Sequence, residues 1–220
     1  LGIAPEIISG VLASSIKTAA FFTTSPEEHA HVELLPIEFP LFIKPIIGGD
    51  SRGINADSIV HDFEGFKKKV LEIHQNQGTR SLVEPYLIGN EYSVGILEDC
   101  SSGQLQSMPV EIIPSKNEFG DYILDFNVKK NDTEKVVIIT SQKIKDQVSN
   151  LACNAFRALE GKLFGRIDIK MDRKGTPHFL EANLLPGLGE GYFYRACFLN
   201  LNMSYEEMIV AIAKNALVEK

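Results

Sequence analysis

Hydrophobic and polar positions along the chain predict short strands interspersed with amphipathic helices. Residues 40–45 (PLFIKP) form a short apolar run that ends at a proline, which is typical of a buried strand. Residues 80–97 predict two strands joined by a proline-containing link with Gly89-Asn90 as punctuation. Residues 58–76 predict a helix, because apolar side chains recur at about helical spacing: Phe63, Phe66, Val70, Leu71 and Ile73.

The second half of the chain continues this mixture. Residues 106–114 (QSMPVEIIP), 164–171 (FGRIDIKM) and 177–183 (PHFLEAN) predict strands, and residues 141–161 predict an amphipathic helix that stops at Gly161. Residues 203–217 predict a closing helix, with Ser204 and Glu207 spaced as a capping box. Residues 46–54 and 115–135 are polar and loop-like. The pattern predicts an α+β or α/β chain.

Composition limits the class of protein. The 220 residues suit one large domain or two small ones, and 44% hydrophobic residues allow a sizeable core. A net charge of −7 argues against a general nucleic-acid binder. The sequence lacks an 18-residue apolar stretch, so we expect no membrane span. Cys100, Cys153 and Cys197 form no CxxC pair, which indicates free thiols in a reducing, cytoplasmic compartment.

The stretch FLEANLLPGLGEG, residues 179–191, places an acid, an amide and a glycine-rich turn at a strand end. A two-residue type I′ turn at Lys174-Gly175 would put Arg173 opposite Thr176, Asp168 opposite Glu181 and Arg166 opposite Asn183. A three-residue loop through Gly175 would instead put Asp168 and Glu181 on opposite faces. With the two-residue turn, the apolar face holds one set of residues: Ile167, Ile169, Met171, His178, Leu180 and Ala182.

Two carboxylates directly opposite each other repel, and this pairing is tolerated where a cation lies between them or one of them is protonated. Mg²⁺ prefers hard oxygen ligands, so Asp168, Glu181 and the amide oxygen of Asn183 form a candidate metal site. Arg166 would present a planar fork of donors to phosphate oxygens. The alternative is a solvated hairpin in which these side chains form surface salt bridges.

Two further segments carry candidate binding residues. KPIIGGDSRGI (44–54) follows a strand, and its glycines could let backbone N–H groups close over phosphates while Lys44 supplies a charge. An ordinary mobile loop and a lysine that reaches solvent are the alternatives. In LVEPYLIGNEYSV, a linker backbone could read an adenine edge, and Glu84 or Glu91 could meet ribose hydroxyls; two exposed acids are the alternative.

In order and spacing, these segments resemble an ATP-grasp ligase of the D-alanine–D-alanine ligase type over nearly the whole chain. GVLASS (10–15) looks like the family's exit from its N-terminal domain, and FIKPIIGGDSRGI (42–54) resembles its phosphate-covering segment. LVEPYLIGNEYSVGIL (82–97) matches the nucleotide hinge. FGRIDIKMDRKGTPHFLEANLLPG (164–187) is close to the metal-binding signature, and this match is the specific one.

The resemblance implies an ATP-grasp fold with two α+β lobes and the nucleotide site between them. Residues 1–20 would be a linker remnant from a missing N-terminal domain, 21–84 the small lobe and 85–220 the C-terminal lobe with the metal site. The chain lacks an initiator Met and begins inside the family pattern, so we expect a fragment of a longer protein.

The resemblance also implies roles for individual residues. Arg166 would stabilise the transferring phosphate, and Mg²⁺, with Mn²⁺ as a substitute, would be held by Asp168, Glu181 and Asn183. Lys44 would meet the ATP phosphates, Glu84 and Leu87 the adenine, and Glu91 the ribose. The full set of expected ATP-binding residues is Lys44, Gly48, Gly49, Ser51, Glu84, Leu87 and Glu91. The substrate side would hold Asp50, Pro186, Gly187 and Tyr192.

The substrate half departs from the family pattern. Asp50 and Tyr192 stand where the family has serines, and the lysine-tyrosine pair of its mobile loop falls near Asp125-Phe126. Lys129 or Lys130 could replace that lysine, and Lys17 is a poor match for the lysine that usually follows GVLAS.

The expected activity is an ATP-dependent carboxylate–amine ligase that forms an acyl phosphate and joins amino acids or similar small carboxylates. The alternatives are a true D-alanine–D-alanine ligase of cell-wall synthesis and a non-catalytic ATP-binding module. We expect neither nucleic acid nor membrane as a partner, and a homodimer is compatible with the resemblance.

Overall fold

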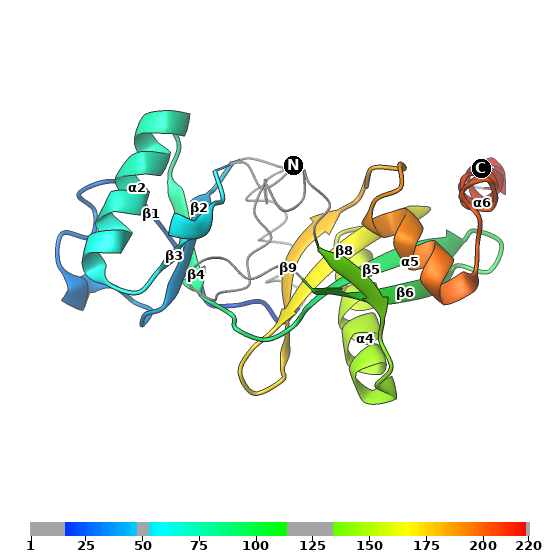
Figure 1. The fold of residues 1–220 in the computed structure, drawn as a ribbon. Coiled ribbons are helices and arrows are strands. Elements are labelled where there is room, and N and C mark those ends of the chain that lie inside the picture. The colour runs from blue at the N-terminus through cyan, green and yellow to red at the C-terminus, as the bar shows by residue number, and fades with distance from the viewer. Residues whose placement is uncertain (1–15, 48–52, 114–133, 219–220) are drawn as a thin grey trace. The chain divides into compact units, whose positions relative to one another are not determined.

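The computed structural model describes residues 16–47, 53–113 and 134–218 (Figure 1). Contacts within the chain divide it into two compact units. Among these residues, unit 1 contains 19–47, 53–88 and Glu134, and unit 2 contains 16–18, 89–113 and 135–218. No helix in the described ranges is long and apolar enough to cross a membrane.

In its described residues, unit 1 is a sheet that packs against a long helix. Its described part contains a four-stranded antiparallel sheet in the order β1-β4-β2-β3. The elements are β1 (Phe22–Thr24), η1 (Val32–Leu34), β2 (Leu41–Pro45), η2 (Ala56–Ser58), β3 (Ile59–Val60), α2 (Phe63–Gln77) and β4 (Ser81–Pro85). Helix α2 packs its apolar face on the sheet through a buried cluster: Leu41, Ile43, Val60, Phe66, Val70, Ile73 and Val83.

Helix α2 starts later than the sequence pattern predicted. Ile59 and Val60 pair with β2 as a strand, and Asp62 then caps the helix by accepting a hydrogen bond from Gly65 N at 2.8 Å. Gly78 ends the helix in the left-handed region, with φ +63°. The predicted helical range 58–76 was therefore wrong at its first residues, because a local cap and strand pairing outcompete the periodicity there.

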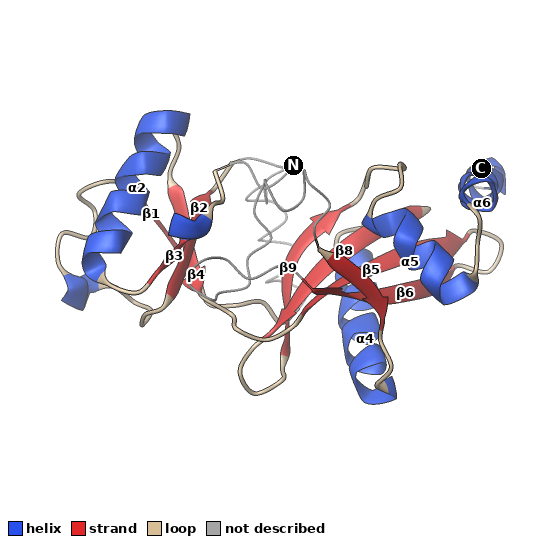
Figure 2. Ribbon diagram, viewed as in Figure 1, coloured by secondary structure: helices blue, strands red, loops and turns tan. Residues whose placement is uncertain are grey.

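Unit 2 is a sheet with helices on both faces (Figure 2). Its described part contains a five-stranded antiparallel sheet in the order β7-β6-β5-β8-β9. The strands are β5 (Glu91–Asp99), β6 (Gln104–Ile113), β7 (Lys135–Ile138), β8 (Phe164–Met171) and β9 (Pro177–Asn183). The helices are α4 (Gln142–Ala158), α5 (Tyr192–Leu201) and α6 (Tyr205–Val218). The sequence pattern did not predict β7 or α5, whereas the capping box of Ser204 and Glu207 is confirmed.

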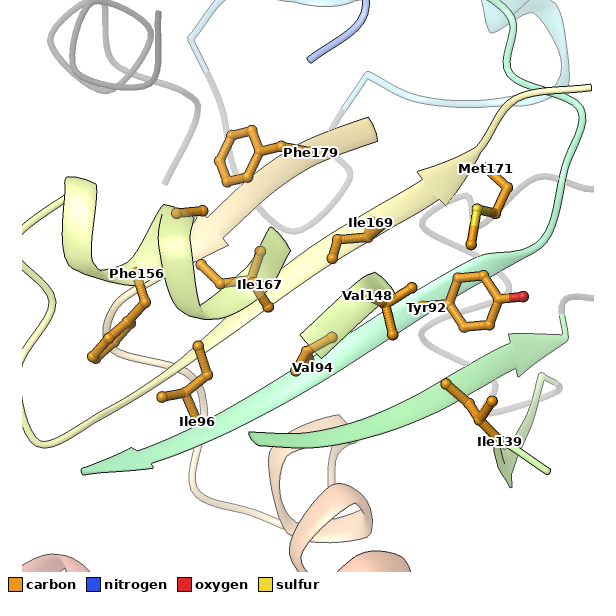
Figure 3. Packing of buried hydrophobic residues seen from close by; sticks show 12 residues of the cluster. Tyr92, Val94, Ile96, Ile139, Val148, Phe156, Ile167, Ile169, Met171 and Phe179 are labelled. Atoms are coloured by element: carbon orange, nitrogen blue, oxygen red, sulfur yellow. The ribbon is translucent and has the colours of Figure 1, made fainter. Parts of the chain in front are cut away.

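The core of unit 2 lies between α4 and alternate residues of the central strands (Figure 3). Tyr92, Val94 and Ile96 of β5 point toward α4, and their neighbours Ser93 and Gly95 point to the opposite face. On that opposite face, α5 packs against Gly95, because a Cβ there would lie 3.2 Å from Cβ of Ala196. On the same face, polar side chains of β8 and β9 lie beside Ser93 and Gly95.

Candidate active site

Four predicted site residues meet on one face of the unit 2 sheet. Asp168 of β8 lies directly opposite Glu181 of β9, and Arg166 lies opposite Asn183. The intervening Ile167 is fully buried on the face that α4 covers. Strand alternation therefore separates an apolar face from a polar one, and the four side chains gather on the polar face.

The hairpin reaches this register by a route that differs from the predicted one. Asp172 lies at the base of a three-residue loop, because its N–H donates to Thr176 O at 2.9 Å and its side chain accepts from Lys174 N and Thr176 N. Gly175 occupies the left-handed position of the loop, with φ +73°. The two-residue turn, with Arg173 opposite Thr176, was wrong.

A β-bulge then restores the carboxylate pairing. Ile169 lies opposite Phe179 while Asp168 lies opposite Glu181, so Leu180 is the extra residue. Phe179 consequently packs in the core, and His178 lies opposite Lys170 on the polar face. The prediction that His178 belongs to the apolar face was wrong, and Leu180 is an unpaired bulge residue, but the prediction that Asp168 and Glu181 share a face is confirmed.

Arg166 is the cation that compensates the paired acids. Its Nε donates to Oδ1 of Asp168 at 3.0 Å and its Nη2 donates to Oδ2 at 2.8 Å. The same Nη2 lies 3.8 Å from Oε1 of Glu181. Burial by itself lowers the pKa of Arg166, but the neighbouring charge and hydrogen bonds of Asp168 outweigh it, so the pKa lies above its ordinary value. The guanidinium is therefore permanently charged beside both carboxylates.

Two neutral side chains complete the cluster. Ser93 of β5 donates to Oδ1 of Asp168 at 2.7 Å, and this bond is buried. Nδ2 of Asn183 lies 3.3 Å from Oδ2 of Asp168 and 3.3 Å from Oε1 of Glu181. Sequence reasoning missed Ser93, although its position on the polar side of an alternating strand was an available signal.

The donor set fits a divalent cation of the magnesium type. The described residues contain no group of three or more His, Cys, Asp and Glu side chains arranged for a metal. Mg²⁺ needs fewer protein ligands, because it is usually bound by one or two carboxylates and completes its shell with water and substrate phosphates. Asp168 and Glu181 supply two carboxylates, and rotation of the Asn183 amide would add a carbonyl oxygen. Tetrahedral metals that require nitrogen or sulfur ligands fit poorly here.

The residues predicted on the substrate side begin directly after β9. Pro186 is buried and Gly187 is exposed, and both precede α5. The first residue of α5, Tyr192, places its ring 5.3 Å from Cζ of Arg166. The aromatic ring and the guanidinium are thus close enough for a cation–π contact. The sequence analysis had assigned Tyr192 to the substrate side and Arg166 to the transferring phosphate, without a contact between them.

The predicted nucleotide residues of unit 1 also form a pair. Nζ of Lys44 lies 2.7 Å from Oε2 of Glu84, and both side chains are largely buried. The two residues lie on neighbouring antiparallel strands, where Phe42 is opposite Glu84. Lys44 therefore has an acidic partner inside the protein. Leu87, farther along, is half-buried.

The remaining predicted residues lie elsewhere. Glu91, at the start of β5, pairs with Lys170 of β8. Gly48, Gly49, Asp50 and Ser51 lie outside the described residues. So do the candidates of the predicted mobile loop: Asp125, Phe126, Lys129 and Lys130.

A family model described as "D-ala D-ala ligase C-terminus" matches residues 14–214. The chain belongs to this family. The resemblance inferred from the sequence motifs is confirmed, and the match covers both units.

Curated relatives are similar at moderate identity. D-alanine–D-alanine ligase B of Clostridium perfringens (strain 13 / Type A) is 27% identical over 213 residues, which cover 94% of this chain and 65% of the relative. D-alanine–D-alanine ligase of Clostridium botulinum (strain Okra / Type B1) is 27% identical over 205 residues, covering 93% and 64%. The chain thus spans slightly less than two thirds of these relatives.

Solved structures share the fold. D-alanine–D-alanine ligase from Bacillus anthracis complexed with ATP superposes with a TM-score of 0.73 at 19% identity, over 96% of this chain and 64% of that one. VanG D-Ala:D-Ser ligase from Enterococcus faecalis gives a TM-score of 0.74 at 22% identity, over 95% and 60%. The predicted α+β, ATP-grasp fold is confirmed.

Proposed function

We propose that the protein carrying this chain is an ATP-dependent carboxylate–amine ligase related to D-alanine–D-alanine ligase. The observation that carries the proposal is the cluster on the polar face of unit 2, where Arg166 contacts both Asp168 and Glu181. The family membership supports the same reaction class. A surface salt-bridge cluster would not require a buried carboxylate, whereas Asp168 is only 7% exposed.

The chemistry needs activation of a poor electrophile. One oxygen of the substrate carboxylate attacks the γ-phosphorus of ATP, the bond to the β-phosphate oxygen breaks, and ADP leaves. The amine of the second substrate then attacks the carbon of the acyl phosphate, phosphate leaves with the bonding electrons, and the amine loses a proton. The product is an amide, and both steps are favoured mainly by positioning and electrostatics.

The residues of the cluster would divide this work. Asp168, Glu181 and Asn183 would hold Mg²⁺ or Mn²⁺, which when bound neutralises charge on ATP phosphates. Arg166 would turn its donors toward the oxygens of the transferring phosphoryl group, in a fork that matches phosphate geometry. Ser93 fixes Oδ1 of Asp168 and thereby orients that carboxylate. The Tyr192 ring, 5.3 Å from Cζ of Arg166, would help to hold the guanidinium in place.

The nucleotide contacts are proposed from the motifs and from local geometry. Lys44 would release Glu84 in part and donate to ATP phosphates, while the backbone near Glu84 and Leu87 would meet adenine. The 2.7 Å pair supports this by placing a charged donor and an acid side by side on neighbouring strands, and the phosphate contact would have to offset the free energy lost when the pair loosens. Glu91 would accept hydrogen bonds from ribose hydroxyls.

We propose small amino acids or similar carboxylates as substrates, and the departures at Asp50 and Tyr192 favour a substrate other than D-alanine. The relatives' names favour the alternative of a true D-alanine–D-alanine ligase in peptidoglycan synthesis. A non-catalytic ATP-binding module is the alternative from another class.

The test measures ADP release by the purified protein with ATP and Mg²⁺, with and without D-alanine and with a panel of amino acids, together with mass spectrometry of products. Amine-dependent ADP release with a condensed product supports a ligase. Dependence on D-alanine supports the true D-alanine–D-alanine ligase. ATP binding without turnover supports the module, and an Asp168→Asn variant provides the background rate.

A further inference from the structure

Lys170 is a buried charge that the proposed chemistry does not use. It lies two residues after Asp168 on β8, so it shares the polar face with Asp168 and Arg166. The residue is only 9% exposed. A lysine ammonium is strongly hydrated in water, so burial at this level is costly unless a carboxylate compensates it.

Glu91 provides that compensation. Nζ of Lys170 donates to Oε2 of Glu91 at 2.9 Å, and the two residues are directly opposite each other in the β5–β8 ladder. The next cross-strand neighbour, His178 on β9, contacts Asp172 instead, at 3.1 Å. Asp172 is further engaged by two backbone N–H groups of the hairpin loop. The geometry therefore pairs Lys170 with Glu91 and leaves Asp172 to the loop.

We infer that Lys170 is a positioning residue that holds Glu91 as an acceptor for the ribose hydroxyls of the nucleotide and thereby sets ribose selectivity. The inference rests on the proposed function, in which ATP is the substrate. Lys170 acts through Glu91 and does not itself contact the reacting atoms.

The chemistry of a carboxylate explains why a fixed ammonium is useful here. An ionised carboxylate has two oxygens and about four acceptor sites, and Lys170 occupies a site on Oε2 only. The other oxygen, Oε1, keeps its acceptor capacity for a vicinal diol. The ammonium also removes rotamer freedom from the Glu91 side chain before the ligand arrives, which lowers the cost of binding.

A purely structural ion pair is the competing explanation, and ribose selectivity separates the two. The experiment compares wild type, Lys170→Met and Lys170→Arg in steady-state kinetics with ATP, 2′-deoxy-ATP and 3′-deoxy-ATP. In Lys170→Met we expect KM for ATP to rise about tenfold, the scale of a weakened hydrogen bond to a charged group, with kcat changed by less than about twofold. We expect the preference for ATP over the deoxynucleotides to shrink by the same factor, and Lys170→Arg to restore most of it.

Two further variants guard against a folding artefact. Glu91→Gln should lose the same ribose preference, and Glu91→Gln combined with Lys170→Met should lose no more, because both changes disable one contact. The double variant leaves no unpaired charge, so its thermal unfolding should stay closer to wild type than that of Lys170→Met. Unchanged ribose preference in Lys170→Met, or a loss of kcat with constant KM, would overturn the inference. Absence of ATP binding in the wild type would instead overturn the proposed function together with it.

Discussion

Arg166 and Asp168 form a two-point contact along a single strand: Nε and Nη2 of the arginine donate to Oδ1 and Oδ2 of the aspartate at 3.0 and 2.8 Å. Both side chains are largely buried, at 15% and 11% exposed. The charged guanidinium of Arg166 is therefore held beside the carboxylates of Asp168 and Glu181. A metal that enters the cluster would bind the carboxylate of Asp168, and a phosphate would bind the guanidinium of Arg166, so each would replace the partner that the other group loses.

The first prediction is that Arg166→Lys slows product formation. Lysine keeps the charge but cannot form the two-point contact, so the transferring phosphoryl group loses an oriented donor. We expect kcat to fall by about 100-fold or more, the scale for one charge-stabilising group, while ATP affinity falls far less. Rapid-quench measurement of ADP formation and nucleotide titration separate the two effects. A wild-type kcat would assign Arg166 to folding alone.

Glu181→Gln tests the metal role of the opposing acid. The change keeps side-chain size and one oxygen ligand but removes a negative charge, so bound Mg²⁺ should be held less tightly. We expect phosphoryl transfer to fall by about 100-fold or more, with a modest loss of ATP binding and a higher Mg²⁺ requirement. Transfer at the wild-type rate over a magnesium titration would make Glu181 a structural acid. The exposed Glu190→Gln, in the loop beyond β9, is the matched control.

Ser93→Ala tests the buried bond to Asp168. Removal of the hydroxyl leaves Oδ1 of Asp168 with the Arg166 Nε bond but without its 2.7 Å serine donor. We expect the free energy of unfolding to fall by about 1.5–3 kcal/mol, the usual contribution of a hydrogen bond to a charged group. Ser101→Ala removes an exposed hydroxyl that also donates to a carboxylate, Asp99, and should cost less than about 0.5 kcal/mol. If denaturant unfolding gave the same loss of unfolding free energy for Ser93→Ala and Ser101→Ala, burial of the Ser93 bond would not be what makes it stabilising.

Part of the unit 2 sheet was readable from the sequence because β8 alternates strictly between polar and apolar residues from Arg166 onward. FGRIDIKM carries Arg166, Asp168 and Lys170 on one face and buried residues such as Ile167 on the other, so the polar face was predictable. The sequence did not predict which residues of β9 face the core. The bulge at Leu180 accompanies a three-residue Asx-type loop at Asp172 and the burial of Phe179, and a local hydrophobic pattern encodes neither the loop length nor the bulge.

The prediction of a shared carboxylate face was confirmed for a reason different from the one given. Two errors compensated: the loop has three residues and the bulge adds one residue to β9. Contacts between distant segments escaped prediction altogether. The bond from Ser93 to Asp168 spans 75 positions, and the approach of Tyr192 to Arg166 depends on where α5 packs. Family resemblance, by contrast, identified the acidic and basic residues of the cluster directly.

The last prediction concerns acid stability and the hairpin loop. The backbone N–H of Thr176, then the His178 side chain and the backbone N–H of Lys174, stabilise the ionised carboxyl and lower the pKa of Asp172 from 3.8 to about 2. Because the folded-state pKa is depressed, the stabilisation is fully present above pH 3.8 and is lost as the pH falls toward 2. Asp172→Asn keeps the side-chain oxygen that accepts from Lys174 N and Thr176 N but cannot titrate.

We therefore expect wild type to exceed Asp172→Asn in stability at pH 5–7, and the difference to shrink between pH about 4 and about 2. Denaturant unfolding at low ionic strength, repeated at each pH, measures the difference directly. Asp146→Asn is the matched control, because Asp146 is an exposed acid on α4 that accepts from the Gln142 side chain. A difference between wild type and Asp172→Asn that stays constant from pH 6 to pH 2 would contradict the depressed pKa and would leave the Asx-type loop geometry as the whole contribution of Asp172.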